Sequence, residues 1–480
     1  MPTAYRRQGD NYHYAGDCTL NWRFALVPLG SGLISALVLG GKLDESFSEA
    51  VNMEVLAVSF GVTGQVMLVM VLVFGLYMAW SIGANDVANA MGTSVGSRVL
   101  TLRQAIIIAA VMELAGAALA GGHVTDTVRK GIFDPSGLPP QLVAMGFISS
   151  LLAAAVWLQV ATWFGWPVST THSIVGSIVG IGIMIGGVQV IEWRTLGKVV
   201  LSWVTSPLCG GLCSFVVLAV LKRLVLSHSD AMLRLQRVAP GLAFYVFFIL
   251  GMVLFLKGLK NVDFGMQLGR VFVSSCVLGF VGAVGTYMWL RRSPKVESGE
   301  GSSSESHAAE SNRLFGFLIV LSACFLAFAH GANDVANAIG PVAGVIQILR
   351  DGTVNTTSIV SFWILALGGI GIVIGLATWG YRVIETVGSK IMNLNPLTGF
   401  VINLGAATTI VLASRLGFPI STTHTLIGAV LGVGLFQTEM KMDVGKVKEI
   451  IVSWLITVPS GAILAIAFYS IFKVTFGLSG

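Results

Sequence analysis

Two aspartates stand in identical polar octapeptides within an otherwise apolar chain of 480 residues. The octapeptide Gly-Ala-Asn-Asp-Val-Ala-Asn-Ala runs from Gly83 to Ala90 and again from Gly331 to Ala338, and it carries Asp86 in the first copy and Asp334 in the second. A carboxylate inside an apolar segment is costly and is usually functional, and amide oxygens beside it complete a set of hard ligands for a small cation. These amides belong to Asn85, Asn89, Asn333 and Asn337. The octapeptide therefore predicts a site for Na⁺ or for a proton at each aspartate, with the preceding asparagine, Asn85 or Asn333, as a further ligand.

A second motif, Pro-x-Ser-Thr-Thr-His, supplies the donors that an anion would need. It spans Pro167 to His172 and recurs from Pro419 to His424. Proline ends one helix and Ser or Thr caps the next, so each motif predicts a helix that begins inside the membrane. The free N–H groups at such a helix start bind anions, and nearby hydroxyls add donors for a tetrahedral oxyanion. The hydroxyl-bearing residues are Ser169, Thr170, Thr171, Ser421, Thr422 and Thr423.

The two motifs together predict symport of a cation and an anion. A cation beside an anion offsets its charge, so each ion lowers the desolvation cost of the other. Glu113 stands within an apolar run and has no counterpart in the second half, so we expect it to take part in ion coupling rather than in a structural hydrogen bond. His172 and His424 either bind an ion or form hydrogen bonds behind the binding residues. His330 precedes the second octapeptide where Ile82 precedes the first, a difference that the sequence does not explain.

The spacing of the motifs indicates an internal duplication. The octapeptide recurs after 248 positions and the Ser-Thr-Thr motif after 252. A weaker echo, Ser202-Trp203 and Ser453-Trp454, recurs after 251. Packing alone would not require identical polar residues in both halves, whereas a shared site at their junction would.

The composition excludes a water-soluble globular protein. Hydrophobic residues make up 55% of the chain and charged residues 11%, with a mean hydropathy of +0.83, whereas soluble proteins are about 25% charged. Most of its apolar runs approach the roughly 20 residues that cross a bilayer. The chain is therefore expected to be an all-α polytopic membrane protein. Its basic residues flank the runs singly, which argues against a nucleic-acid partner, and its five cysteines have no metal-ligand spacing.

The basic loops predict an inverted arrangement of the two halves. The loops near 222–237 and 291–313 are rich in Lys and Arg, so the positive-inside rule places both in the cytoplasm. Counting spans from these loops makes the two octapeptides end helices of opposite direction, as in the inverted repeats of secondary transporters. We expect discontinuous helices, interrupted at Gly83 and Pro167 in the first repeat. The corresponding interruptions of the second repeat are Gly331 and Pro419, and such pairs point to a substrate site near the membrane midplane.

The predicted organisation has four parts. Residues 1–53 form a cytoplasmic N-terminal tail and an extra first span, and 54–222 form the first repeat. Residues 223–313 form a connecting region with two spans, and 314–473 form the second repeat. The Ser- and Glu-rich stretch 293–311 is expected to be a disordered linker.

These motifs resemble those of the inorganic phosphate transporter (PiT) family. The resemblance rests on both octapeptides, on both Pro-x-Ser-Thr-Thr-His segments, and on Ile339-Gly340-Pro341, Val99 to Ala105, Thr127 to Ile132 and Val387 to Ile391. It covers about Val55 to Phe472, nearly the whole chain. It implies import of inorganic phosphate with Na⁺ or H⁺, although some members prefer sulfate.

The resemblance also implies a fold and a site. The fold would have two inverted repeats, about twelve transmembrane helices and two re-entrant hairpins, assembled as a homodimer. By this likeness Asp86 and Asp334, with the neighbouring asparagines and the Ser-Thr-Thr residues, would hold phosphate and the coupling cation. The short middle loop is similar to that of microbial members.

The sequence therefore predicts a multi-pass plasma-membrane symporter for inorganic phosphate that works by alternating access, with Na⁺ or H⁺ as coupling ion and no cofactor. A sulfate symporter is the alternative within the family, and an anion channel is the alternative outside it. An intramembrane hydrolase could use the serine and histidine of the second motif. That pair lacks an orienting acid in sequence and an enzyme has little reason to duplicate it, so enzyme activity is not expected.

Overall fold

Apolar segments of the chain form long helices, because a helix satisfies its backbone hydrogen bonds internally, as a bilayer requires. The computed structural model describes residues 53–122, 132–135, 137–255, 268–292, 304–354, 362–386, 394–416, 420–436 and 443–477. Within these ranges ten helices are long and apolar enough to cross a membrane, and two shorter apolar helices are Thr170–Gly186 and Thr422–Phe436. The same ranges contain no strand, only an isolated bridge between Phe133 and Ile191. The prediction of an all-α polytopic fold is confirmed.

The helices divide among the predicted first repeat, connecting region and second repeat, with η3 and α12 crossing the predicted bounds at residues 222 and 314. The first repeat contains α3 (Met53–Asn85), α4 (Ala88–Gly96), α5 (Leu102–Ala120), α7 (Pro140–Trp163), α8 (Thr170–Gly186), η2 (Val188–Val190), α9 (Trp193–Leu221) and the π-helical turn η3 (Lys222–Leu226). The connecting region contains α10 (Ala231–Val253) and α11 (Leu268–Arg292). The second repeat contains α12 (Ser304–Asp351), α13 (Phe362–Trp379), α14 (Tyr381–Glu385), α15 (Pro396–Arg415), α16 (Thr422–Phe436) and α17 (Val444–Thr475).

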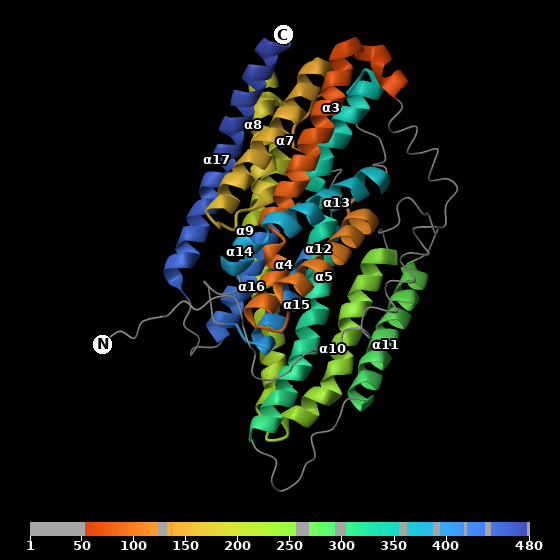
Figure 1. Cartoon of the computed structure of the whole chain (residues 1–480), viewed down its shortest axis with the longest axis vertical. Helices are drawn as coiled ribbons and strands as arrows, with labels where there is room; N and C mark the ends of the chain where they lie inside the picture. The colour runs from red at the N-terminus through yellow and green to blue at the C-terminus, as the bar shows by residue number, and fades with distance from the viewer. Residues whose placement is uncertain are drawn as a thin grey trace. The chain divides into compact units, whose positions relative to one another are not determined.

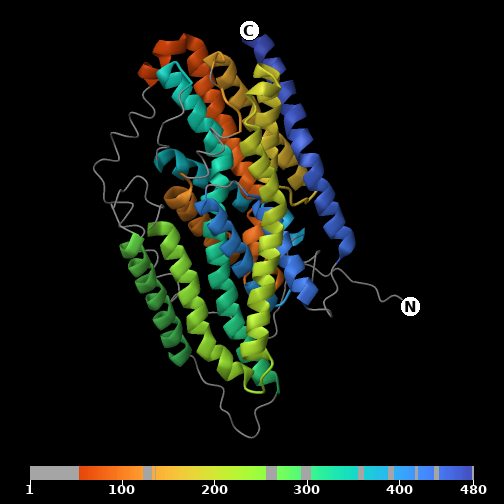
Figure 2. The same ribbon diagram turned by 180° about the vertical axis from the view of Figure 1, so that it is seen from behind.

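The two repeats interlock with reciprocal contacts. Helix α3 packs on α13 as α12 packs on α5, and α8 packs on α17 as α16 packs on α9. Helices α7 and α8 form one hairpin and α15 and α16 form the other, and each hairpin carries one copy of the Pro-x-Ser-Thr-Thr-His motif. Followed from the N- to the C-terminus in Figures 1 and 2, α3 and α9 run downward, whereas α12 and α17 run upward. This is the predicted inverted duplication.

The glycine of each octapeptide permits a close approach between the repeats. A Cβ atom on Gly83 would lie 1.8 Å from the carbonyl oxygen of Ile372 in α13. A Cβ atom on Gly331 would lie 2.3 Å from the carbonyl oxygen of Glu113 in α5. Since backbone cannot yield to such a clash, both positions require glycine. The matched contacts also make Ile372 the structural counterpart of Glu113.

The first repeat has the predicted break at Pro167, but its other break lies at Asp86 and Val87 rather than at Gly83, which is inside α3, and there is no break at Gly331. Helix α3 ends at Asn85 and α4 begins at Ala88, and Pro167 lies in the loop between α7 and α8. In the second repeat α12 is continuous from Ser304 to Asp351, so the expectation of a break at Gly331 is wrong. Glycine there serves close packing against α5 instead, and the helix keeps its hydrogen bonds. The second predicted proline break, Pro419, lies outside the described residues.

Two parts of the predicted organisation fall wholly or largely outside the described residues. They are residues 1–53, apart from Met53, and residues 293–303 of the predicted linker. The remainder of that linker, 304–311, was expected to be disordered but forms the start of α12. Ala308, Ala309 and Glu310 are good helix formers, which accounts for the difference.

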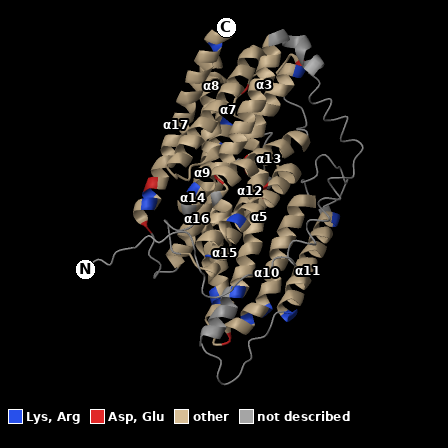
Figure 3. Cartoon of the chain, viewed as in Figure 1, with Lys and Arg blue, Asp and Glu red and all other residues tan. Residues whose placement is uncertain are grey.

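Charged residues are scarce along the helices and gather near their ends, as Figure 3 shows at the start of α17 and around the lower ends of α10 and α11. Among the residues that the structure describes, three carboxylates depart from this pattern. Asp86, Glu113 and Asp334 are at most 1% exposed. Their burial directs attention to the junction of the two repeats.

Candidate functional site

Asp86 accepts hydrogen bonds from threonines of both repeats. It lies in the turn between α3 and α4, where Asn89 N bonds to Asp86 O at 2.9 Å. Thr170 Oγ1 donates to Asp86 Oδ2 at 2.8 Å, and Thr423 Oγ1 donates to Asp86 Oδ1 at 2.5 Å. Asn89 Nδ2 donates to the same Oδ1. One buried carboxylate thus joins the Ser-Thr-Thr segments that begin α8 and α16.

Asp334 lies within α12 and shares a threonine with Asp86. Thr422 Oγ1 donates to Asp334 Oδ2 at 2.7 Å and lies 3.5 Å from Asp86 Oδ2. The imidazole Nε2 of His330 is 2.8 Å from Asp334 Oδ2 and 3.9 Å from Asp86 Oδ2. The two predicted carboxylates are therefore neighbours, separated by one hydroxyl and one imidazole.

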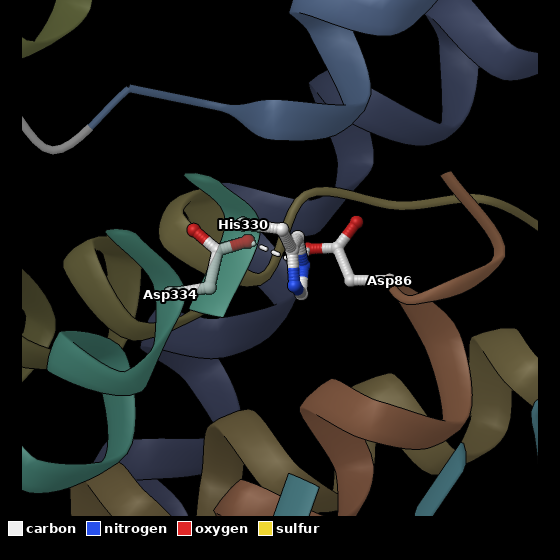
Figure 4. Close-up of side chains that lie close together, drawn as sticks. All are labelled: Asp86, His330 and Asp334. Atoms are coloured by element: carbon white, nitrogen blue, oxygen red, sulfur yellow. Dashed lines mark ion pairs between the residues drawn. The ribbon is translucent and has the colours of Figure 1, made fainter. Parts of the chain in front are cut away.

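His330 joins the aspartates to Glu113. Its Nδ1 lies 2.8 Å from Glu113 Oε2, so each ring nitrogen faces a carboxylate oxygen. Figure 4 shows the imidazole between the carboxyl groups of Asp334 and Asp86. The imidazole thus lies among three carboxylates, with a hydrogen bond to Glu113 and a 2.8 Å contact between Nε2 and Asp334.

Two of the four asparagines reach across the junction. Asn89 Nδ2 donates to Thr423 Oγ1 of the second repeat at 3.0 Å. Asn337 Nδ2 lies 3.2 Å from Thr170 Oγ1 and 3.1 Å from Thr171 Oγ1 of the first repeat. These amides therefore orient the hydroxyls of the opposite repeat.

The other two asparagines hold the loops that precede α8 and α16. Asn85 Nδ2 donates to Thr162 Oγ1 at 2.9 Å and to the carbonyl oxygen of Trp166 at 3.0 Å, and its Oδ1 accepts from Val168 N at 3.2 Å. The amide of Asn333 lies 2.9 Å from Ser414 Oγ, the position equivalent to Thr162. Geometry thus favours loop positioning for Asn85 over the predicted ion ligation. With its amide turned, Asn333 would donate to the carbonyl oxygen of Ile420 at 3.2 Å and to Asp334 Oδ1 at 2.8 Å, so it stands beside both the loop and the aspartate.

The serines of the motif cap the helices that they precede. His172 N donates to Ser169 Oγ at 3.2 Å, and His424 N donates to Ser421 Oγ at 3.1 Å. These caps were predicted from the Pro-x-Ser-Thr-Thr pattern and are confirmed. Each serine hydroxyl keeps its own hydrogen for another acceptor.

The two loops are also tied to each other. Thr171 Oγ1 donates to the carbonyl oxygen of Ile420 at 3.2 Å, and Thr423 Oγ1 lies 3.3 Å from the carbonyl oxygen of Val168. The bonds are reciprocal, because each threonine reaches the residue before the serine of the opposite motif. The two helix starts are therefore held face to face.

His172 and His424 lie behind the threonines in a row of four rings. Their ring centroids are 4.3 Å apart. His172 packs 3.8 Å from Trp203, and His424 packs 3.5 Å from Trp454. His424 Nδ1 donates to the carbonyl oxygen of Trp203 at 3.1 Å. This row explains the repeated Ser-Trp pair of the sequence, and it favours the interpretation of both histidines as residues behind the site.

The cluster can hold a cation beside an anion. Asp86, His330 and Asp334 each offer a ligand atom, and these atoms lie within 4.8 Å of one another. Carboxylate and hydroxyl oxygens suit a hard cation, while threonine hydroxyls and two helix starts suit an oxyanion. The hydroxyls of Thr170, Thr422 and Thr423 currently serve the carboxylates, so one set of groups could serve either ion.

Sequence reasoning missed His330 as a member of this site. The signal was present, since an ionisable residue stands before the second octapeptide where an isoleucine stands before the first. Its partner could not be named, because Glu113 is 217 positions away and belongs to the other repeat.

Comparison with known proteins identifies the family. The sequence profile described as the phosphate transporter family matches residues 82–465. The chain belongs to the phosphate transporter family. It is 42% identical over 424 residues to a candidate phosphate permease of Chlamydia trachomatis, covering 85% of this chain and 99% of that one. It is 43% identical over 430 residues to the chloroplastic inorganic phosphate transporter 2-1 of Arabidopsis thaliana, covering 84% and 71%.

A solved member of the phosphate transporter family has the same fold. The structure described as the sodium-dependent phosphate transporter superposes with a TM-score of 0.79 at 38% identity, covering 85% of this chain and 99% of that one. Together with ten apolar helices of spanning length among the described residues, this makes the chain a multi-pass membrane protein. The predicted family is confirmed, and these relatives carry the names of transporters and permeases.

Proposed function

We propose that this protein imports inorganic phosphate together with Na⁺ by alternating access. Family membership supports phosphate as the substrate, and a structural relative named as sodium-dependent supports Na⁺ over H⁺. The observation that carries the coupling is Asp86, whose carboxylate accepts hydroxyl hydrogens from Thr170 of one repeat and Thr423 of the other.

The coupling follows from the hydrogens that each threonine can give. A hydroxyl has one hydrogen, so a threonine that donates to a carboxylate cannot also donate to phosphate. Na⁺ bound at Asp86 and Asp334 would stabilise the two carboxylates in place of the threonine hydroxyl donors. The released hydroxyls, with Asn89, Asn337 and the helix starts, would then bind phosphate. Each ion thereby raises the affinity for the other by the same factor.

The remaining predicted residues divide into four roles. Ser169, Thr171 and Ser421 stand at the helix starts and would complete the phosphate shell. Asn85 and Asn333 would set the positions of the loops. Glu113, through His330, would adjust the charge that the two aspartates present to the cation, and His172 and His424 would support the helix starts from behind.

Alternating access would arise from the inverted repeats. A fixed site at the junction can face either side when one repeat moves relative to the other. We further propose a plasma-membrane location with the N-terminus in the cytoplasm, from the positive-inside pattern of the basic loops. A homodimer is proposed from the family resemblance alone.

The decisive experiment is uptake of labelled phosphate into proteoliposomes with an imposed Na⁺ gradient, an imposed pH gradient, or neither. We expect accumulation with the Na⁺ gradient and indifference to excess unlabelled sulfate. Accumulation with the pH gradient alone would replace Na⁺ by H⁺. Block by sulfate would make the protein a sulfate symporter, and equilibration without accumulation would make it a channel.

A further inference from the structure

The loop between α7 and α8 is tied at an inner and an outer point. Inside, Asn85 Nδ2 donates to the carbonyl oxygen of Trp166 at 3.0 Å. Outside, Trp166 Nε1 donates to Glu449 Oε1 of α17 at 3.0 Å. The preceding Gly165 has φ +68°, a conformation that glycine adopts without strain. Since both ties act on one residue, Trp166 connects α17 mechanically to the loop that leads into Thr170.

A cavity of about 350 Å³ that is partly open to the surface lies beside the outer tie. Its walls include Trp157, Trp166, Glu449, Val452, Ser453 and Ile456. Trp157 also crosses from α7 to α17, where its Nε1 donates to Thr457 Oγ1 at 3.1 Å. Because the ring of Trp166 forms part of the wall, its release from Glu449 would leave the cavity open toward the loop.

The second repeat lacks the chemistry for an equivalent tie. By the offsets of the duplication, Phe418 stands where Trp166 stands, and Lys198 stands where Glu449 stands. Phenylalanine has no donor and lysine has no acceptor. The outer hydrogen bond therefore forms at the loop before α8 and has no equivalent at the loop before α16, although the surrounding helices pack reciprocally.

We propose that the Trp166–Glu449 hydrogen bond is a one-sided latch, which holds the loop of the first repeat closed over the ion site. Its part in transport rests on the proposed function. Neither residue is among the partners of Asp86 or Asp334, so both act as positioning residues through Asn85. An interaction present in one of two related states shifts their populations by its differential stability. The latch thus makes the loops before α8 and α16 unequal, although the helices around them are symmetric.

The hydrogen bond must be separated from the charge of Glu449. Lys446 Nζ lies 2.5 Å from Glu449 Oε2, so the carboxylate also forms an ion pair. E449Q keeps an oxygen that can accept from Trp166 and removes the charge, whereas E449A removes both. K446M removes the ion pair and keeps the latch. W193F is a matched control. Trp193, at the start of α9, also donates a hydrogen bond from its Nε1, at 3.0 Å to the carbonyl oxygen of Val188.

Cysteine labelling reads the latch without any transport. Ser453 lines the cavity and is 5% exposed, so S453C should react slowly with N-ethylmaleimide in the purified full-length protein. The labelling rate of the parent chain, which keeps Ser453, is subtracted from that of each variant to correct for labelling of the native cysteines. We expect W166F and E449A to raise the labelling rate of S453C at least threefold. E449Q, K446M and W193F should leave it within twofold.

Phosphate uptake in the same variants, with Ser453 restored, supplies the second readout. Release of the latch should raise KM for phosphate at least threefold with a smaller change in maximal rate, because the loop that leads into Thr170 is no longer held. E449Q should rescue KM. A uniform loss of rate in W166F and E449A, with unchanged KM, would be the sign of a merely structural contact.

The outcomes separate the latch from the transport function. Unchanged labelling in W166F and E449A would overturn the latch, and so would E449Q labelling as fast as E449A. If wild-type proteoliposomes take up no phosphate, the proposed function fails while the labelling comparison still decides whether the latch exists.

Discussion

The two copies of the octapeptide have the same eight residues and different structures. Around Asp86 the helix breaks, with α3 ending at Asn85 and α4 starting at Ala88. Around Asp334 the helix α12 continues unbroken. The glycine contacts match in both copies, so the scaffold is symmetric. The duplicated fold supplies matched positions, and the differences in polarity between the copies decide what each position does.

The polarity differs at two matched positions that flank the aspartates. His330 and Glu113 form a 2.8 Å contact at the second copy. Ile82 and Ile372 occupy the corresponding positions at the first copy, as the offsets and the glycine contacts indicate. A buried charged pair at one copy and an apolar pair at the other would make the two aspartates electrostatically unequal. Four sets of variants can break or sharpen this comparison.

The largest effect is expected from making the second copy resemble the first. H330I would leave the buried Glu113 without its partner, at a cost of about 3–5 kcal/mol of stability, whereas E113I would leave His330 beside Asp334 and should cost less. The double variant E113I/H330I should recover most of that loss, because it removes both partners. Thermal unfolding of the detergent-purified proteins measures the stability of the two single variants and of the double variant. A double variant no more stable than the worse single variant would show that the pair does not act as a unit.

The aspartates themselves come next. D86N and D334N should each lower Na⁺-driven phosphate uptake roughly 100-fold, near the upper end of coupling between two ligands. D86N should be the more severe, because Asp86 accepts hydroxyls from both repeats. The amount of protein in the membrane, measured by immunoblot, should match wild type. Near-normal uptake by both variants would remove the aspartates from the site.

The motif glycines test the symmetric part of the comparison. G83A and G331A would each place a methyl group against a backbone carbonyl, and overpacking of this kind costs about 1–3 kcal/mol. G83A should be the worse, since its Cβ would lie 1.8 Å from Ile372 O against 2.3 Å from Glu113 O for G331A. Melting temperatures measure both. G241A is the control, because a Cβ there meets no atom within 4 Å.

The smallest effect is expected in the ring row. H424F would lose a hydrogen bond from Nδ1 to the carbonyl oxygen of Trp203, whereas H172F would keep ring contact with Trp203. A neutral hydrogen bond contributes about 1 kcal/mol, so H424F should melt a few degrees below H172F. Equal melting temperatures would mean that ring packing alone accounts for both histidines. A loss of uptake as large as that of D86N would instead make them ligands.

Much of the fold could be predicted because it follows from patterns that are local or repeated. The apolar runs predicted the helices, and the Pro-x-Ser-Thr-Thr pattern predicted the helix caps at Ser169 and Ser421. The matched motifs indicated a shared site, and Asp86 does contact threonines of both repeats. These inferences need only the chain itself and the physics of a bilayer.

The rest depended on tertiary contacts that no local pattern encodes. Identical octapeptides adopt a break in one copy and a continuous helix in the other, so neighbouring helices decide the backbone. The partnership of His330 with Glu113 joins residues 217 positions apart and occurs once, so repetition could not reveal it. Asn85 looked like an ion ligand by residue type, yet its polar atoms hold the loop from Thr162 to Val168.

The crossed bonds between the two loops have a consequence for the history of the chain. Thr171 donates to Ile420 O, and Thr423, which donates to Asp86, lies 3.3 Å from Val168 O, so each motif is part of the other's binding surface. A substitution in one copy therefore changes contacts of the other copy, so the two segments depend on each other. Flanking helices, which meet different neighbours, are free to drift apart. This accounts for nearly identical motifs within two halves that otherwise differ widely in sequence.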